Sequence, residues 1–304
     1  MSVVINTNVD STKIQNILTS STDKLSQSMQ RMSSGLKIVN AKDDAAGTVI
    51  SARMKVQLNG NEIAQKNVQN GNALLSTVEG NVDVIADNVS RIRDLTLQAK
   101  NGTYSDEEIK AMDDEVQERI AEINRVHSSA KFSSLDLFSS DKNTNGTLAK
   151  DGATFQVGSD AGENNTITAG SSIFQSVQFS AISGLQNFSL TKLATAEPTM
   201  GNGKTVDDVA GDNNYDKAVR ALDLAIDDLS DRKSLIGSAG NRLDSALSTL
   251  TTQFENLSSS NSLITDADIA SEASKFTQNQ ILQQISTSLL AQANSAPSIA
   301  MSLV

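Results

Sequence analysis

The chain has 304 residues, of which 3% are aromatic and two are prolines. Few aromatic residues permit only thin cores, and few prolines leave long stretches free to be helical. There is no cysteine and one histidine, His127, which excludes disulfides and most metal or nucleophilic chemistry. The net charge of −11 argues against nucleic acid as a partner, because phosphate binding requires a basic patch.

The sequence also lacks signals for a membrane. It has no run of about 18 apolar residues, so we expect no membrane span. Residues 1–10 contain no basic segment followed by an apolar one, so we expect no secretory signal.

The first segment shows a helical heptad pattern diluted by serine and threonine. Apolar residues, with one threonine among them, recur in alternating steps of four and three at Leu18, Thr22, Leu25, Met29, Met32 and Leu36. Such a helix is marginal alone, because backbone ordering costs about 1–2 kcal/mol per residue. We expect it to fold only where neighbours cover its apolar stripe, and to break at residues 33–35.

The next segment predicts one long helix from about Asp43 to about Ala99. Apolar or small residues alternate in steps of four and three at Ala64, Val68, Gly71, Leu75, Val78, Val82, Ile85, Val89 and Ile92. At about 1.5 Å per residue the helix is on the order of 80 Å long. A helix of this length requires other helices along its seam.

A shorter helix follows the Asn101-Gly102 stop signal. Ser105 and Glu108 form a capping-box pattern, and an apolar face runs from Ile109 to Val126. We expect this helix to end near Lys131 and to lie back antiparallel on the distal part of the long helix.

Residues 132–214 are rich in Gly, Asn, Ser, Thr and Asp. The alternating runs 154–157 and 166–168 predict a β-hairpin, and we expect the whole stretch to be a surface segment rather than a second core.

The second half returns to a helical pattern. Ala218 to Leu257 carries a seam interrupted by Gly237 and Gly240, and a serine break is expected at residues 258–260. The last helix is expected to start near Thr265 and to end at Pro297. Its apolar stripe includes Ile269, Phe276, Ile281, Ile285 and Leu289.

These elements predict a mainly α fold: a long antiparallel α-helical coiled-coil rod with a small β-hairpin region, in which the N- and C-terminal helices are paired. We expect three parts. Residues 1–42 and 262–304 form terminal helices, 43–131 and 215–261 form the rod, and 132–214 form the hairpin and surface segment. Terminal helices that cannot bury their stripes within one molecule are candidates for packing between copies, and head-to-tail packing that does not close gives a helical filament.

The sequence resembles bacterial flagellins at both ends. The first half carries matching motifs at residues 5–8 (INTN), 31–38 (RMSSGLKI), 41–47 (AKDDAAG), 91–96 (RIRDLT) and 155–158 (FQVG). The second half carries them at residues 241–246 (NRLDSA), 266–268 (DAD), 280–284 (QILQQ) and 290–294 (LAQAN). The motifs occur in the family's order and span about residues 1–162 and 215–304.

The resemblance implies a filament subunit that is exported unfolded through the flagellar type III secretion channel. It also implies that the terminal helices form an inner tube and the middle helices an outer tube. Implied partners are copies of the chain, an export chaperone, and the cap and hook-filament junction proteins. No cofactor, nucleic acid or membrane is expected as a partner.

The resemblance further implies recognition by host sensors. The positions matching a Toll-like receptor site are Arg91, Leu95 and Glu115, and the last helix resembles the segment sensed by cytosolic inflammasome receptors. The alternative is that Arg91 and Glu115 form an interhelical ion pair and that Leu95 packs between helices.

No constellation of catalytic groups is evident, so we expect no enzyme. His127 has no motif partner and is expected at a helix end or on the surface. Asp43-Asp44 and Asp113-Asp114 are adjacent pairs, which do not face each other on a helix and are expected to cap helices or lie in solvent. The remaining alternatives are a hook-filament junction protein related to flagellin and a secreted coiled-coil adhesin or effector that does not polymerise.

Overall fold

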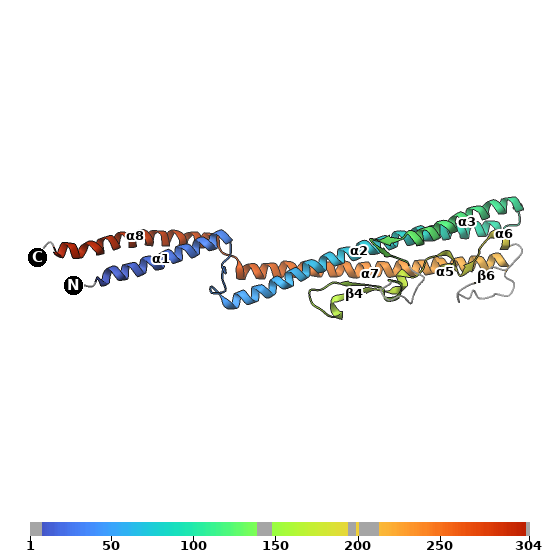
Figure 1. Cartoon of the computed structure of the whole chain (residues 1–304). Coiled ribbons are helices and arrows are strands. Elements are labelled where there is room, and N and C mark those ends of the chain that lie inside the picture. Colours follow the sequence, from blue (N-terminus) through green and yellow to red (C-terminus); the bar gives the residue numbers. More distant parts are fainter. Residues whose placement is uncertain (1–7, 139–147, 194–198, 201–212, 302–304) are drawn as a thin grey trace. The chain divides into compact units, whose positions relative to one another are not determined.

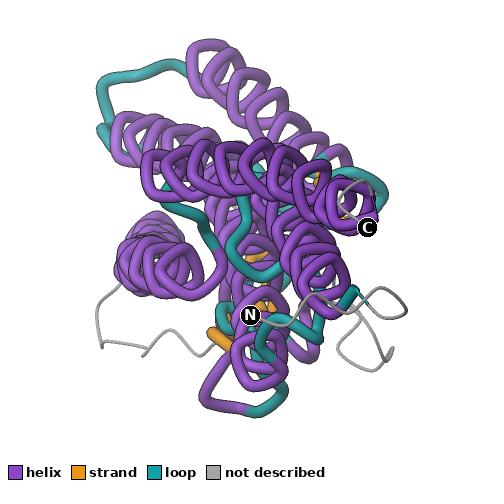
Figure 2. Tube along the Cα trace, turned by 90° about the vertical axis from the view of Figure 1, so that its left-hand side faces the viewer, coloured by secondary structure: helices purple, strands orange, loops and turns teal. Residues whose placement is uncertain are grey.

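The computed structural model describes residues 8–138, 148–193, 199–200 and 213–301. Long helices dominate these parts and the strands are short (Figure 1, Figure 2). The long helices are α1 (Val9–Ser34), α2 (Ala45–Ala99), α3 (Asp106–Ser129), α7 (Asn214–Thr265) and α8 (Ile269–Met301). The predicted mainly helical fold with a small β-hairpin region is confirmed.

The described residues between α3 and α7 form short elements. Three antiparallel strand pairs are β1 (Lys131–Phe132) with β2 (Leu135–Asp136), β3 (Ala153–Gln156) with β4 (Thr166–Ala169), and β5 (Leu185–Gln186) with β6 (Thr199–Met200). The other elements are α4 (Leu148–Asp151), η1 (Glu163–Asn165), η2 (Ser171–Phe174), α5 (Phe179–Ser183) and α6 (Leu190–Leu193). The β3–β4 hairpin, in which Phe155 lies opposite Ile167, confirms the predicted hairpin.

The chain divides into two compact units. Unit 1 takes its residues from 1–59 and 253–304, and unit 2 consists of residues 60–252. Helices α2 and α7 contribute residues to both units. These boundaries differ from the predicted ones at residues 42 and 262, and the predicted three-part division stays a prediction.

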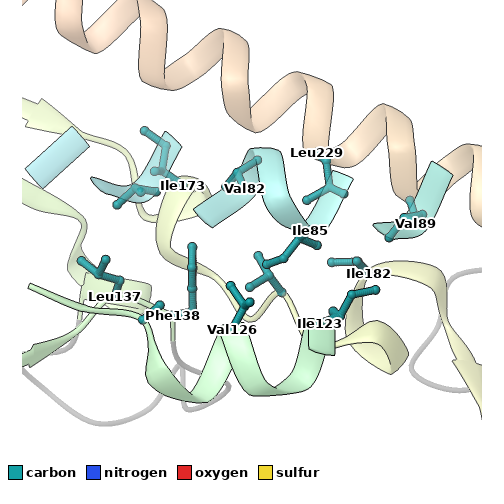
Figure 3. Close-up of a cluster of buried hydrophobic side chains, with 14 of the residues drawn as sticks. Val82, Ile85, Val89, Ile123, Val126, Leu137, Phe138, Ile173, Ile182 and Leu229 are labelled. Atoms are coloured by element: carbon teal, nitrogen blue, oxygen red, sulfur yellow. The ribbon is translucent and has the colours of Figure 1, made fainter. Parts of the chain in front are cut away.

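Unit 2 has a continuous hydrophobic core built on α2. Every position of the predicted 64–92 stripe is buried. Figure 3 shows part of this core, where side chains of α2, α3, α7 and the middle segment point toward one another. A fully buried Val, Leu or Ile side chain contributes about 1.5–3 kcal/mol, so this stripe is a major source of the stability of unit 2.

Polar contacts set the antiparallel register of the helices in unit 2. Along α2 and α7, Asn72 donates to Asp244 at 2.7 Å, Lys233 pairs with Asp83 at 2.8 Å, and Arg93 pairs with Asp223. Along α2 and α3, Arg91 pairs with Glu115 and Arg119 donates to Asn88. Both α3 and this part of α7 therefore run antiparallel to α2, as the sequence predicts for α3.

The described middle segment is more than a surface segment. Five large side chains of residues 173–190 have at most 1% of their surface exposed: Ile173, Phe174, Ile182, Leu185 and Leu190. They belong to the same cluster as the α2 stripe. The expectation of a surface segment is therefore wrong for residues 173–190, which belong to the core of α2 and not to a second core. The apolar residues of this stretch have no regular period from which their burial could be predicted.

Two glycines of α2 leave room for the β3–β4 hairpin to approach the helix backbone. A Cβ atom at Gly60 would lie 2.7 Å from the Ser159 Cβ, and one at Gly71 would lie 3.0 Å from a ring carbon of Phe155. Between them, Asn67 donates to the Gln156 carbonyl at 3.4 Å. The hairpin therefore packs along one face of α2.

Predicted helix ends are partly confirmed. Gly35 ends α1 with a left-handed backbone (φ 72°), and Ser105 and Glu108 form the predicted capping box of α3. The predicted break at residues 258–260 is wrong, because α7 continues to Thr265. The last helix begins at Ile269, where the Asp268 carboxylate accepts hydrogen bonds from the Ala270 and Ser271 amides.

The predicted end at Pro297 is also wrong, because α8 continues to Met301. Proline lacks an N–H, so the carbonyl four residues earlier, that of Ala293, loses its helical donor. The Asn8 side-chain amide donates to this carbonyl at 2.8 Å. A contact with the other end of the chain thus supplies the missing hydrogen bond.

Candidate assembly surfaces

Helices α1 and α8 of unit 1 lie side by side (Figure 1). Asn8 contacts Ala293, the Gln283 side chain donates to Thr22 at 3.3 Å, and Arg31 lies 3.6 Å from Glu272. The helices are therefore antiparallel, and the predicted pairing of the terminal helices is confirmed.

The covered seam between α1 and α8 carries apolar and polar residues in equal number. On α1 the buried or half-buried positions follow three-four spacing at Ser11, Ile14, Leu18, Ser21, Leu25, Ser28 and Met32. On α8 they follow the same spacing at Glu272, Phe276, Asn279, Gln283, Ser286, Leu290 and Ala293. Heptad spacing lets the helices pair, and the polar residues at half of these positions reduce the apolar area that the pair buries.

The structure divides the predicted polymerisation residues between two environments. Five are half-buried in unit 1: Leu18, Leu25, Met32, Leu36 and Phe276. The other five are 47–54% exposed: Met29, Ile269, Ile281, Ile285 and Leu289. On α8 the predicted apolar stripe is thus mostly the outward face, and the prediction missed the buried polar positions of the seam, Ser21, Ser28 and Ser286.

The polar cluster around Glu272 was also missed. Glu272 is 5% exposed and accepts from Lys275 at 2.8 Å, which lowers the pKa of its carboxyl, with Arg31 adding to the effect. A contact between Arg31 and Glu272 requires one register of α1 against α8. Steps of three and four that pass through polar residues are the signal that could have found this seam.

Unit 1 has no buried hydrophobic residue among its described residues. Every described side chain of the hydrophobic core belongs to residues 64–250, within unit 2. In unit 1 the buried residues are polar or glycine, namely Ser21, Ser28, Gly47, Ser51, Thr265, Glu272 and Ser286. Large apolar side chains instead remain exposed on α1, α8 and the start of α2. An exposed apolar surface of this kind marks a site of interaction with another molecule.

The segments that join the paired helices are themselves ordered by hydrogen bonds. The Lys37 amide donates to the Thr265 carbonyl at 2.6 Å, and the Ala267 amide donates to Gly35 at 2.9 Å. Asp44 caps α2 by accepting from the Gly47 amide at 2.9 Å. Backbone hydrogen bonds from Asn40 and Val39 to Asp43 lower the pKa of this carboxyl. The expectation that Asp43 and Asp44 act at the start of the helix is thus confirmed.

The three positions expected at a Toll-like receptor site lie close together in unit 2. Arg91 donates two hydrogen bonds to Glu115, at 3.0 and 3.2 Å, and these lower the pKa of the Glu115 carboxyl. Leu95 is buried, with 2% of its surface exposed. The arrangement is the interhelical ion pair and packed leucine of the alternative interpretation.

The titratable residues that the sequence analysis considered for catalysis serve packing and capping in the structure. His127 is not at the surface but buried in the last turn of α3, where burial lowers its pKa and its ring stacks on Phe138. Asp113 holds the start of α6 by accepting from the Leu190 amide at 2.7 Å and from the Ser189 hydroxyl at 2.8 Å.

Within the described ranges no cluster of His, Cys, Asp and Glu could hold a metal ion. No helix of those ranges is apolar enough over a sufficient length to cross a bilayer.

Comparison with known proteins gives matches at both ends of the chain. Residues 5–143 match the bacterial flagellin N-terminal helical region, and residues 219–304 match the bacterial flagellin C-terminal helical region. The chain belongs to the bacterial flagellin family. A flagellar filament 30.7 kDa core protein of Treponema maltophilum is 32% identical over 96% of both chains. A flagellin of Serratia marcescens is 33% identical, and the polar flagellin F of Vibrio parahaemolyticus is 29% identical, both over the full length of each chain.

Family membership fixes the main role of the chain. As a flagellin it is a structural subunit that assembles with its own copies into the extracellular filament of the bacterial flagellum, which serves motility. At 304 residues it fits a flagellin without large outer domains. The exposed apolar surface of unit 1 therefore has an expected occupant, namely other copies of the chain.

Proposed function

We propose that the α1–α8 pair lines the axis of the filament and that its outward apolar side chains pack against neighbouring copies. The observation that carries the proposal is the absence of buried hydrophobic residues among the described residues of unit 1. The antiparallel pair already covers its own seam, so the face left for copies contains Met29 on α1 and Ile281, Ile285 and Leu289 on α8. Burial of each such side chain contributes at most about 1.5–3 kcal/mol, and this gain exists only in the assembly.

A pair of matched variants tests this role. Leu289 in α8 and Leu135 in β2 are both 48% exposed in the single chain. We expect Leu289→Asp to abolish or strongly slow filament growth from seeds, because assembly would bury the new carboxylate. Leu135→Asp should grow at about the wild-type rate. Both variants should keep the wild-type melting temperature as monomers, because neither side chain is part of the core.

Negative-stain microscopy gives the readout and separates the alternatives. Long filaments of uniform diameter from the wild type support a filament subunit, whereas discrete particles or short caps would favour an adhesin or a hook-filament junction protein. If Leu289→Asp forms normal filaments, α8 does not pack against copies through this face and the proposal is wrong.

We further propose that the chain is no enzyme and that it leaves the cell unfolded through the flagellar type III channel, with an export chaperone and with cap and hook-filament junction proteins as partners. The α1–α8 pair supports this route, because none of its described apolar residues is buried, so its separation costs less free energy than opening the core of unit 2. The absence of cysteine means that no disulfide opposes unfolding.

Recognition by host sensors is proposed for Arg91 and Glu115, whose side chains are partly exposed, and for α8. Leu95 is buried, so we assign it to packing between helices and not to direct contact. Binding of Arg91→Ala to the Toll-like receptor is the test, and unchanged affinity would remove this partner site.

A further inference from the structure

The first turns of α2 expose apolar side chains and bury small or polar ones. Val49 is 55% exposed and Val56 is 72% exposed, whereas Gly47 and Ser51 are buried. β-Branched residues gain nothing from exposed positions on a helix, where their propensity is low. This face of α2 is therefore arranged for a partner that covers it.

A positively charged side chain, that of Arg53, lies in the middle of this face. Arg53 follows Val49 by four residues and precedes Val56 by three, so the three side chains share one side of the helix. Arg53 is exposed, and within the described part of the chain it forms no ion pair. A partner that fits this face must supply both apolar side chains and a carboxylate.

A face of complementary chemistry lies on α7 in unit 2. Leu224 and Leu235 are 43% and 46% exposed, and Asp227 and Asp231 lie between them on the same side of the helix. The two leucines are about 17 Å apart along the helix axis. Both aspartates are exposed and have no ion pair to any described residue.

The neighbouring acids of α7 are already paired within the chain. Asp223 pairs with Arg93, and Asp228 pairs with Arg232 at 3.0 Å. In its own copy this stretch of α7 also pairs with α2 through Lys233 and Asp83. The outward face with Asp227 and Asp231 thus remains for a second copy.

We propose that the α2 face of one copy, Val49, Arg53 and Val56, docks on the α7 face of a second copy, Leu224, Asp227, Asp231 and Leu235. The Arg53 guanidinium lies between the two carboxylates, and the apolar side chains of the two helices cover one another. The proposal rests on assembly of the chain into a filament. Every copy carries both faces, so the contact is head-to-tail. A head-to-tail contact whose rotation does not close a ring repeats as an open polymer, which is the form that a filament requires.

A charge exchange tests the pairing in the full chain. Arg53→Glu places three carboxylates together and should slow elongation from wild-type seeds by about tenfold or more at low salt. Asp231→Arg should slow it similarly, because two cations then face each other. The double variant Arg53→Glu with Asp231→Arg should recover most of the wild-type rate, since one opposite-charge pair is restored.

Lys55→Glu is the matched control, because it makes the same charge change two residues away on another side of α2. Asp231→Arg should not compensate for Lys55→Glu. If Arg53→Glu elongates at the wild-type rate, or if the double variant is as slow as the single variants combined, the docking is wrong while the filament function stands. If the wild type itself forms no filament, the proposed function fails first.

Cysteine cross-linking gives a second measurement that does not depend on rates, because the chain has no cysteine of its own. Filaments would be copolymerised from Val56→Cys with either Leu224→Cys or Leu235→Cys and then oxidised. We expect one of the two mixtures to give disulfide-linked dimers, and which one reports the direction of the paired helices. Val56→Cys mixed with Leu135→Cys should give none. Filaments that yield no dimer in either test mixture would overturn the proposal.

Discussion

Asn8 performs two tasks at the start of α1. Its side-chain oxygen Oδ1 accepts from the Ser11 amide at 3.0 Å, which caps α1, and its side-chain amide donates to the Ala293 carbonyl that Pro297 leaves without a donor. Asn8→Ala removes both hydrogen bonds. We expect it to weaken the α1–α8 pair by about 1–2 kcal/mol, the usual cost of a lost N-cap. Amide hydrogen exchange of α1 in the monomer would measure the change.

Pro297→Ala separates the two tasks of Asn8. In Pro297→Ala the residue 297 amide can donate to Ala293, so the contact from Asn8 is no longer required. Asn8→Ala should therefore cost less in the Pro297→Ala background than in the wild type. Equal costs in both backgrounds would mean that Asn8 acts only as the cap of α1 and that the contact with Ala293 contributes nothing.

At the scale of elements, close packing of the β3–β4 hairpin against α2 depends on Gly71. Alanine is the better helix former by about 1 kcal/mol, but its Cβ at residue 71 would lie 3.0 Å from the Phe155 ring and 3.2 Å from the Leu243 side chain. Overpacking of this kind costs about 1–3 kcal/mol. We expect Gly71→Ala to lower the free energy of unfolding of unit 2, measured by urea titration.

Gly80→Ala on the same helix is the control. A Cβ at Gly80 meets no atom within 4 Å, so only the gain in helix propensity remains and the variant should be stabilised by up to about 1 kcal/mol. The informative quantity is the difference between the two variants. If Gly71→Ala were as stable as Gly80→Ala, the hairpin would not pack tightly on α2.

Buried positions could be predicted from the sequence for some elements and not for others, and the reason is physical. The α2 seam could be read because its buried positions, such as Val68 and Ile85, are apolar and recur in steps of three and four. The α8 seam could be read only in part, because Asn279, Gln283 and Ser286 share the covered positions with Phe276 and Leu290. Several apolar residues of α8, such as Ile281 and Leu289, face outward. Residues 173–190 were missed because short irregular elements bury side chains without any period.

The same limit applies to helix ends and to the candidate site. The break at residues 258–260 was inferred from serine content, but serine lowers helix propensity by only a few tenths of a kcal/mol per residue, so three serines do not end a long helix. Of the positions inferred from the family resemblance, Arg91 and Glu115 form an ion pair and Leu95 is buried, which is the alternative that the sequence analysis gave for them.

At the scale of the whole chain, the two units differ in the contacts that stabilise each of them internally. Unit 2 buries a long apolar stripe, whereas no hydrophobic residue is buried in the described part of unit 1, where polar contacts such as that between Arg31 and Glu272 join α1 to α8. Regions with few buried apolar contacts open at low free energy. In the monomer we therefore expect the amides of α1 and α8 to exchange orders of magnitude faster than those of residues 64–95, and to become protected in the filament.

Hydrogen exchange of α2 also locates the boundary between the units. If unit 1 ends at residue 59, amides of residues 48–59 should exchange at rates close to those of α1, although they belong to the same continuous helix as the protected residues 64–95. If the boundary predicted at residue 42 is correct, they should be protected like the rest of α2. Uniform protection of the monomer from α1 to α8 would contradict both, and would show that the terminal helices are stable without assembly.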